Sequence, residues 1–220
     1  MPIVPKNSER TDKIVQAAAQ LFARQGYHGT STREIARLAD VSENTLFRHF
    51  DHKEDLFWSA LRSRSNGLKM RRDLLDGIAG CDEPEVVLPK IIDQLVDTVI
   101  FKPELVRLIA VAFLELHWKT EAFCQEYLSP IFSAISHYVE MNIENEKVRR
   151  LDPTMVTTAL VTTVMAHAEI ARLIDGGKLT YPGSREAASA YTKFWLDVLA
   201  PRPAVSPQTL SRNNSKESRP

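Results

Sequence analysis

Apolar side chains recur every three or four residues along almost the whole chain. That spacing lines one face of an α-helix, whereas a half-buried β-strand would alternate apolar and polar side chains. No alternating run is long enough to predict a strand, and eight glycines leave few positions for hairpin turns. The pattern therefore predicts an all-α fold.

Capping signals divide the beginning of the chain into short helices. The first is expected from about residue 9 to residue 25, ending at Gly26, which tolerates the left-handed backbone of a helix terminus. Ser31 and Glu34 have the spacing of a capping box and start a second helix that ends near residue 39. Ser42 is expected to cap a third helix, which ends near residue 50. These segments form a compact helical unit.

Longer helices are expected after this unit. A fourth helix, capped by Asp51 with Glu54 at its third position, is predicted over residues 53–72. Ser129 and Asp152 each precede a proline, an arrangement typical of a helix start. The remaining predicted helices cover residues 86–100, 103–118, 121–128, a segment beginning at 129, 152–175 (ending at Gly176 and Gly177) and 184–199.

The last two predicted helices carry more apolar surface than one buried face requires. Such a surplus is typical of a subunit interface, although an intramolecular core would give the same pattern. The candidate residues for a homodimer interface are Ala159, Thr163, Ala166, Ile170, Ala187, Tyr191, Phe194, Trp195 and Val198.

The charge of the 220-residue chain is unevenly distributed. Its formal net charge is zero and its pI is about 7.0, which by itself argues against a binder of nucleic acids. However, residues 1–75 hold 13 basic and 9 acidic side chains, whereas residues 76–200 hold 11 and 18. A basic N-terminal part and an acidic remainder suggest two parts with different partners. Residues 201–220 lack apolar periodicity and are expected to be a disordered tail.

Several functional classes lack their sequence signals. Cys81 and Cys124 are too few for a disulfide framework and lack metal-ligand spacing, so we expect no metal and no cofactor. No signal peptide or stretch of 18 apolar residues is present, which favours a cytoplasmic protein without a membrane partner. No nucleophile elbow, phosphate loop or dinucleotide motif occurs, so we expect no enzyme.

Residues 31–50 have the pattern of a helix-turn-helix, in which a short second helix lies in the major groove of DNA. The side chains of Ile35, Ala36, Leu38, Val41 and Leu46 would form the apolar joint between its helices. Leu21, Phe22 and Phe50 are also expected in the core. The opposite face is polar.

Residues 9–57 closely resemble the DNA-binding domain of TetR-family transcriptional regulators. The resemblance rests on the motif Ala17-Ala18-x-x-Leu21-Phe22-Ala23-x-x-Gly26-Tyr27-x-Gly29-Thr30-Ser31-x-x-x-Ile35-Ala36-x-x-Ala39-x-Val41-Ser42-x-x-Thr45-Leu46-Phe47-Arg48-His49-Phe50-x-x-Lys53-x-x-Leu56. Residues 103–108 and 148–153 are similar to stretches of its AefR-like branch. The family's organisation implies a helix-turn-helix domain at 1–56 and a larger helical effector-binding and dimerisation domain at 57–200.

The resemblance also implies roles for individual positions. Arg33 and Asn44 match base-reaching positions, because arginine addresses guanine and asparagine addresses adenine. Phe47 departs from the family's usual tyrosine and lacks its phosphate-binding hydroxyl, a contact that Arg48 can replace. The full set of expected DNA-binding residues is Thr32, Arg33, Glu43, Asn44, Thr45, Phe47, Arg48, His49 and Lys53.

The implied function is that of a repressor. A homodimer would bind a palindromic operator in double-stranded DNA and leave it when a small-molecule effector, whose identity the sequence does not give, enters the larger domain. The alternatives are an architectural or protein-interaction module without ligand control, and an activator. Candidate residues for the effector pocket, which would otherwise be ordinary core, are Phe101, Phe113, His117, Trp118, Phe123, Tyr127, Met155, Met165 and His167.

Overall fold

In the computed structural model, residues 6–65, 72–174 and 184–201 are described, and they contain helices and turns but no strand. This confirms the all-α prediction. The main helices are α1 (Lys6–Gln25), α2 (Thr32–Leu38), α3 (Glu43–Phe47), α4 (Lys53–Ser65), α5 (Arg72–Ala79), α6 (Pro84–Phe101), α7 (Pro103–Glu115), α8 (Glu121–Phe123), α9 (Ser129–Glu144), α10 (Pro153–Ile174) and α11 (Ser184–Leu199).

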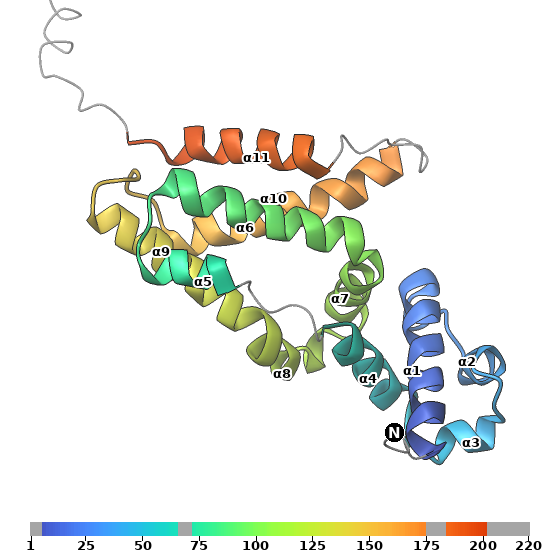
Figure 1. The fold of residues 1–220 in the computed structure, drawn as a ribbon. Helices are drawn as coiled ribbons and strands as arrows, with labels where there is room; N and C mark the ends of the chain where they lie inside the picture. Colours follow the sequence, from blue (N-terminus) through green and yellow to red (C-terminus); the bar gives the residue numbers. More distant parts are fainter. Residues whose placement is uncertain (1–5, 66–71, 175–183, 202–220) are drawn as a thin grey trace, which may run out of the picture.

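The helices form two groups, with α1–α4 gathered at one end of the molecule (Figure 1). We call α1–α4 the head and α5–α11 the body. Within the body, α6 lies against both α10 and α11, and α9 lies against α10. Helix α7 lies where the two groups meet and contacts both α1 and α4.

One hydrophobic core lies in the head but extends into the body. Phe22 of α1 and Phe57 of α4 are fully buried and meet edge to face, with ring centroids 5.2 Å apart. Leu105 and Leu108 of α7 and Phe123 of α8 are buried in the same core. The core therefore continues past residue 56, where we expected the DNA-binding domain to end, and attaches α7 to the head.

A second core fills the body. It joins buried side chains of α6, α9, α10 and α11, including Ile92, Ile135, Val164 and Trp195. Asp152 caps α10 as expected, because its carboxylate accepts a hydrogen bond of 2.6 Å from the Met155 N–H. The final helix has the predicted bounds.

Two sequence predictions about helix starts were wrong, and one helix was missed. We expected Asp51 to cap α4 with Glu54 as its partner. The observed capping bond is instead shifted by one residue, because the Asp55 carboxylate accepts the His52 N–H at 3.1 Å. Helix α5 was not predicted. Ser129 is no cap, because its backbone is already helical and the helical path continues from Glu121 through a wide turn at Cys124–Leu128 into α9. The expected stop at Gly176 and Gly177, and the tail at 202–220, lie outside the described residues.

Candidate DNA-binding site

The start of α2 is fixed by a complete capping box. The Ser31 hydroxyl accepts the Glu34 N–H at 3.2 Å, and the Glu34 carboxylate accepts the Ser31 N–H at 2.9 Å. That backbone donor, with the Ser31 hydroxyl, lowers the pKa of Glu34. Two N–H groups that would otherwise lack partners at the helix start are thereby satisfied, as the sequence predicted.

The turn between α2 and α3 is closed by backbone geometry and apolar contact. Asp40 has a φ of 54°, a left-handed conformation that aspartate tolerates better than most residues. The Val41 N–H then donates to the Ala36 carbonyl at 3.0 Å. Ile35 and Leu46 are fully buried beneath the turn, whereas Leu38 is 49% exposed and was wrongly assigned to the joint.

Helix α3 is short and begins with its own cap. The Ser42 hydroxyl accepts the Thr45 N–H at 3.1 Å and lies 2.8 Å from the Thr45 hydroxyl. The first residues of α2 and α3 are joined directly, since the Thr32 hydroxyl donates to the Glu43 carboxylate at 2.5 Å. The two helices of the motif are thus fixed to each other by a side-chain bond as well as by the turn.

The outer face of this motif presents polar groups to solvent. Arg33 at the start of α2, Asn44 in α3 and Arg48 just after α3 are all exposed. Phe47 lies between them on the chain and is 45% exposed. Guanidinium and amide groups of this kind pair with base edges and phosphates of DNA.

The two remaining basic candidates are held against the head. The Thr11 hydroxyl of α1 lies 3.0 Å from His49 Nδ1, which anchors the segment after α3 to α1. Lys53 Nζ lies 4.3 Å from the centroid of the Tyr27 ring, a cation–π distance. Burial lowers the pKa of Lys53.

The nine expected DNA-binding residues therefore fall into three groups, one of which is the pair His49 and Lys53 that lies against Thr11 and Tyr27. Thr32, Glu43 and Thr45 are half-buried with their side chains engaged inside the motif, so they shape the site. Arg33, Asn44, Phe47 and Arg48 are exposed. All nine lie within the helix-turn-helix or the first turn of α4, and their contacts to DNA stay predictions.

The expected pocket residues do not gather around one cavity in the part of the chain that the structure describes. Phe123 and Tyr127 stack on each other, with centroids 5.0 Å apart, at the core shared with the head. Met165 packs against Val99 and Val106. His117 is exposed, as are Phe101, Phe113 and Met155 at 71%, 43% and 67%. The side chains of Trp118 and His167 lie outside the described residues.

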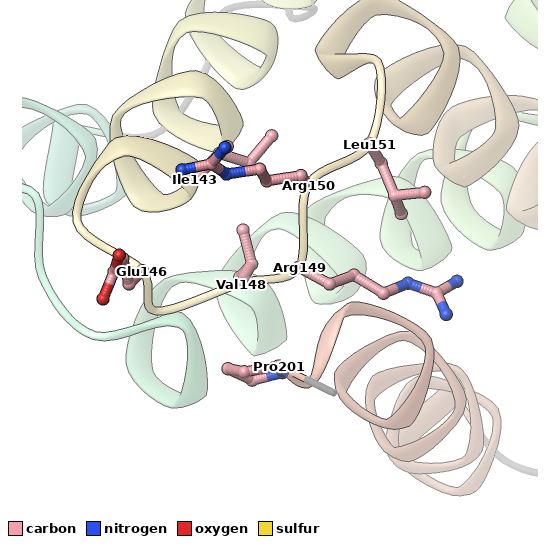
Figure 2. Close-up of a pocket in the computed structure, with 7 residues that line it drawn as sticks. All are labelled: Ile143, Glu146, Val148, Arg149, Arg150, Leu151 and Pro201. Carbon is pink, nitrogen blue, oxygen red and sulfur yellow. The ribbon is translucent and has the colours of Figure 1, made fainter. Parts of the chain in front are cut away.

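Two cavities lie elsewhere among the described residues, one in the body and one between the head and the body. One, of about 640 Å³, is lined by Ile143, Glu146, Val148, Arg149, Arg150, Leu151 and Pro201. Its two arginines extend in opposite directions (Figure 2), so they do not converge on one ligand group. The other, of about 530 Å³, lies between the end of α4 and the α6–α7 corner, with Phe101 the one pocket candidate in its lining.

The interface candidates divide between core and surface. Trp195 and Ala187 are buried within the chain, which corrects their assignment as partner contacts. Ala159, Tyr191 and Val198 are half-buried and pack against the same body core. Thr163, Ala166 and Phe194 are exposed, and Phe194 is 54% accessible. The side chain of Ile170 lies outside the described residues.

Sequence reasoning missed the polar contacts between head and body. Glu115, at the end of α7, accepts the His28 N–H at 2.9 Å, and Lys119 Nζ lies 2.9 Å from Glu54 Oε1 of α4. Residues this far apart along the chain carry no local signal of a contact.

Neither a metal-binding cluster nor a membrane-spanning helix is found among the described residues. Among them, no group of three or more histidine, cysteine, aspartate or glutamate side chains is placed to hold a metal ion. None of the helices in this part of the chain has the length and apolar character needed to span a membrane.

Residues 14–60 match the model of the family described as "Bacterial regulatory proteins, tetR family". The chain is also 44% identical over 54 residues to the uncharacterized HTH-type transcriptional regulator YvkB of Bacillus subtilis. That match covers 24% of this chain and 29% of the relative, so it leaves the greater part of both chains unmatched.

Solved structures extend the likeness to the whole fold. A bacterial regulatory protein of the tetR family from Rhodococcus RHA1 superimposes with a TM-score of 0.68 at 19% identity, covering 89% of this chain and 99% of that one. AibR, in complex with isovaleryl coenzyme A and operator DNA, gives a TM-score of 0.64 at 18% identity, covering 88% and 100%. The N-terminal module of the chain belongs to the TetR family of bacterial regulatory proteins, and the chain as a whole has the fold of that family's regulators.

Proposed function

We propose that the protein is a sequence-specific transcriptional regulator, which binds a palindromic operator as a homodimer and is released by a small-molecule effector. The observation that carries this proposal is the helix-turn-helix of the head. Arg33, Asn44 and Arg48 are exposed on a motif whose two helices are both capped and joined by the Thr32–Glu43 bond. Such a rigid display of donors suits recognition of base edges.

The DNA-binding role does not require a large net charge. Contacts to phosphate are local, and two heads in a dimer double the number of basic groups that meet the DNA. We assign Lys53 and His49, which lie beside the motif, to the DNA backbone, and Arg33 and Asn44 to base edges. The acidic body would face away from the duplex.

Binding of a small-molecule effector, as distinct from release of DNA by it, is supported by two observations. The solved structure of AibR, which shares this fold, holds an acyl-coenzyme A together with operator DNA. In the present chain, the cavity of about 530 Å³ is bordered by Ser63 and Arg64 of α4, the helix that directly follows the DNA-binding motif. A ligand there would contact the one head helix that leads into the body.

A homodimer is the assembly that a palindromic operator requires, because the symmetry of the protein then matches the symmetry of the site. We assign the interface to the exposed faces of α10 and α11, at Thr163, Ala166 and Phe194. The neighbouring side chains of these helices pack into the body core, which gives such a face a rigid support.

Selection of bound fragments from random duplex DNA by the full chain tests the proposal. We expect enrichment of an inverted repeat whose half-sites are about one helical turn apart. A competitive gel shift should then show preference for this repeat over scrambled DNA of the same composition. Binding without sequence preference would contradict the proposal and favour an architectural role. A reporter placed behind the selected operator distinguishes repression from activation by the sign of its response.

A further inference from the structure

A polar clamp joins the end of α7, and the short segment that follows it, to two separate parts of the head. Glu115 Oε2 accepts the N–H of His28, in the turn between α1 and α2, at 2.9 Å. Four residues further along the body, Lys119 Nζ lies 2.9 Å from one Glu54 oxygen of α4 and 3.0 Å from the other. The indole of Trp58 also donates to Glu54, at 3.3 Å. One short segment of the body thus contacts both the α1–α2 turn and helix α4 of the head.

Gly26 makes room for the first contact. Its φ of 77° is a left-handed conformation, and a Cβ built there would lie 2.5 Å from Glu115 Oε1. Any other residue at this position would push the carboxylate away from the turn. The glycine that ends α1 therefore also allows α7 to approach the backbone of the head.

The same carboxylate acts on a residue of the DNA-binding site. Lys53 lies over Tyr27, next to His28 on the chain. Burial lowers the pKa of Lys53, and the negative charge of Glu115 opposes part of this shift. Tyr27 packs on Phe22 and Phe57 in the core. The contact thus lies beside the expected phosphate-binding lysine.

We propose that Glu115 is a positioning residue for DNA binding, which holds the α1–α2 turn on the end of α7 and so fixes the orientation of the head on the body. The inference rests on the proposed function, because it concerns how two heads of a dimer meet one operator. A clamp of this kind affects simultaneous docking of both heads more than the contacts made by either one.

The first test follows the clamp without DNA. Amide hydrogen exchange of the full chain, resolved by NMR, compares wild type with Glu115→Ala, Glu115→Gln and the control Glu144→Ala, which changes an exposed glutamate of α9. We expect the His28 amide to exchange about tenfold faster in Glu115→Ala. Glu115→Gln keeps an acceptor oxygen and should retain most of the protection, and the control should match wild type. Unchanged exchange of His28 in Glu115→Ala would overturn the clamp.

The second test measures positioning. Fluorescence anisotropy compares binding to the operator selected by the wild-type protein with binding to a duplex that holds one half-site. Glu115→Ala should weaken full-operator binding by about tenfold. Half-site binding should change by less than about twofold, and Glu115→Gln should restore full-operator affinity. Equal losses on both duplexes, or no loss on either, would refute positioning.

The two tests separate failure of the clamp from failure of the proposed function. If the wild-type chain selects no operator, the proposed function fails, yet the exchange of His28 still reports on the contact itself. We expect the variants to fold, because Leu108 and Ala112 already hold α7 in the shared core without any contribution from Glu115. Circular dichroism melting of each variant checks this directly.

Discussion

The hydroxyl of Thr32 donates a hydrogen bond to the carboxylate of Glu43, joining the first residue of α2 to the first residue of α3. Both residues match positions that the family resemblance assigned to DNA. In the structure their side chains satisfy each other, so the motif has a fixed interhelical geometry before it meets a ligand. The exposed groups nearby are the ones that we propose contact DNA.

The Thr32–Glu43 bond should contribute measurably to stability. Thr32→Val keeps the shape of the side chain but removes the donor, and we expect a loss of about 1 kcal/mol in the free energy of unfolding. Urea unfolding followed by circular dichroism measures this, with Thr154→Val on the exposed start of α10 as the matched control. A Thr32→Val protein as stable as wild type would show that the bond adds nothing.

Base-reading and phosphate-binding residues should respond differently to substitution. Arg33→Ala and Asn44→Ala are each expected to cost about 1–3 kcal/mol on the selected operator and much less on random DNA, since base contacts carry the specificity. Lys53→Ala should weaken both and reduce the salt slope of log K by about one. Gel-shift titrations at several salt concentrations measure these effects. Equal losses on both DNAs for Asn44→Ala would remove it from the base-reading set.

Substitutions at surface positions and at core positions of the last two helices should have different effects on dimerisation and folding. Phe194→Glu and Ala166→Glu are expected to give folded monomers with weak operator binding, because a charge would be buried in an apolar interface. Trp195→Glu should instead unfold the body, since this tryptophan is 5% exposed within one chain. Sedimentation velocity and circular dichroism distinguish the two outcomes. A wild-type monomer at micromolar concentration would contradict the interface.

The Glu54–Lys119 pair should give an acid-dependent contribution to stability. The hydrogen bond from Lys119, followed by that from Trp58, holds the pKa of Glu54 below its ordinary value of 4.5. A carboxyl whose pKa is lowered by folding adds stability above its unfolded pKa, and this stability is lost as the pH falls through the folded value.

Lys119→Met should accordingly lower Tm by about 1–2 °C at pH 7, the scale of a partly exposed pair in a protein of this size. The difference from wild type should shrink as the pH falls below 4.5. Differential scanning calorimetry across pH 3–7 measures it, with Lys193→Met on the exposed surface of α11 as the control. A Tm difference that stays constant with pH would disprove the titration of Glu54 as its cause.

The sequence predicted the head well because its determinants are local. Ser31 and Glu34 are three residues apart, as are Ser42 and Thr45, so their capping bonds follow from spacing alone. Buried positions such as Ile35 and Leu46 follow from helical periodicity in the same way. The prediction that Leu38 is part of the apolar joint failed, because an apolar residue at the end of a short helix can face solvent and still fit the helical periodicity.

The body was less predictable because its contacts join distant segments. Aromatic residues such as Phe123 and Tyr127 were predicted to line a pocket. They pack against the head instead, through long-range contacts that helical periodicity cannot predict. Trp195 could not be told from an interface residue, because the sequence does not show that α11 packs against α6 and that this side chain is buried in the body core. Ser129 has the residue type of a cap, yet the preceding segment is helical already.

The buried face that α7 presents to Phe22 and Phe57 bears on protein engineering. A chimaera that joins residues 1–56 of this chain to the body of another regulator would cut the last head helix and replace Leu105, Leu108 and Ala112 with foreign side chains. Such a hybrid would have a cavity or a clash beneath its DNA-reading surface. Successful exchange of operator specificity in this protein therefore requires transplanting the inner face of α7 together with the helices that read DNA.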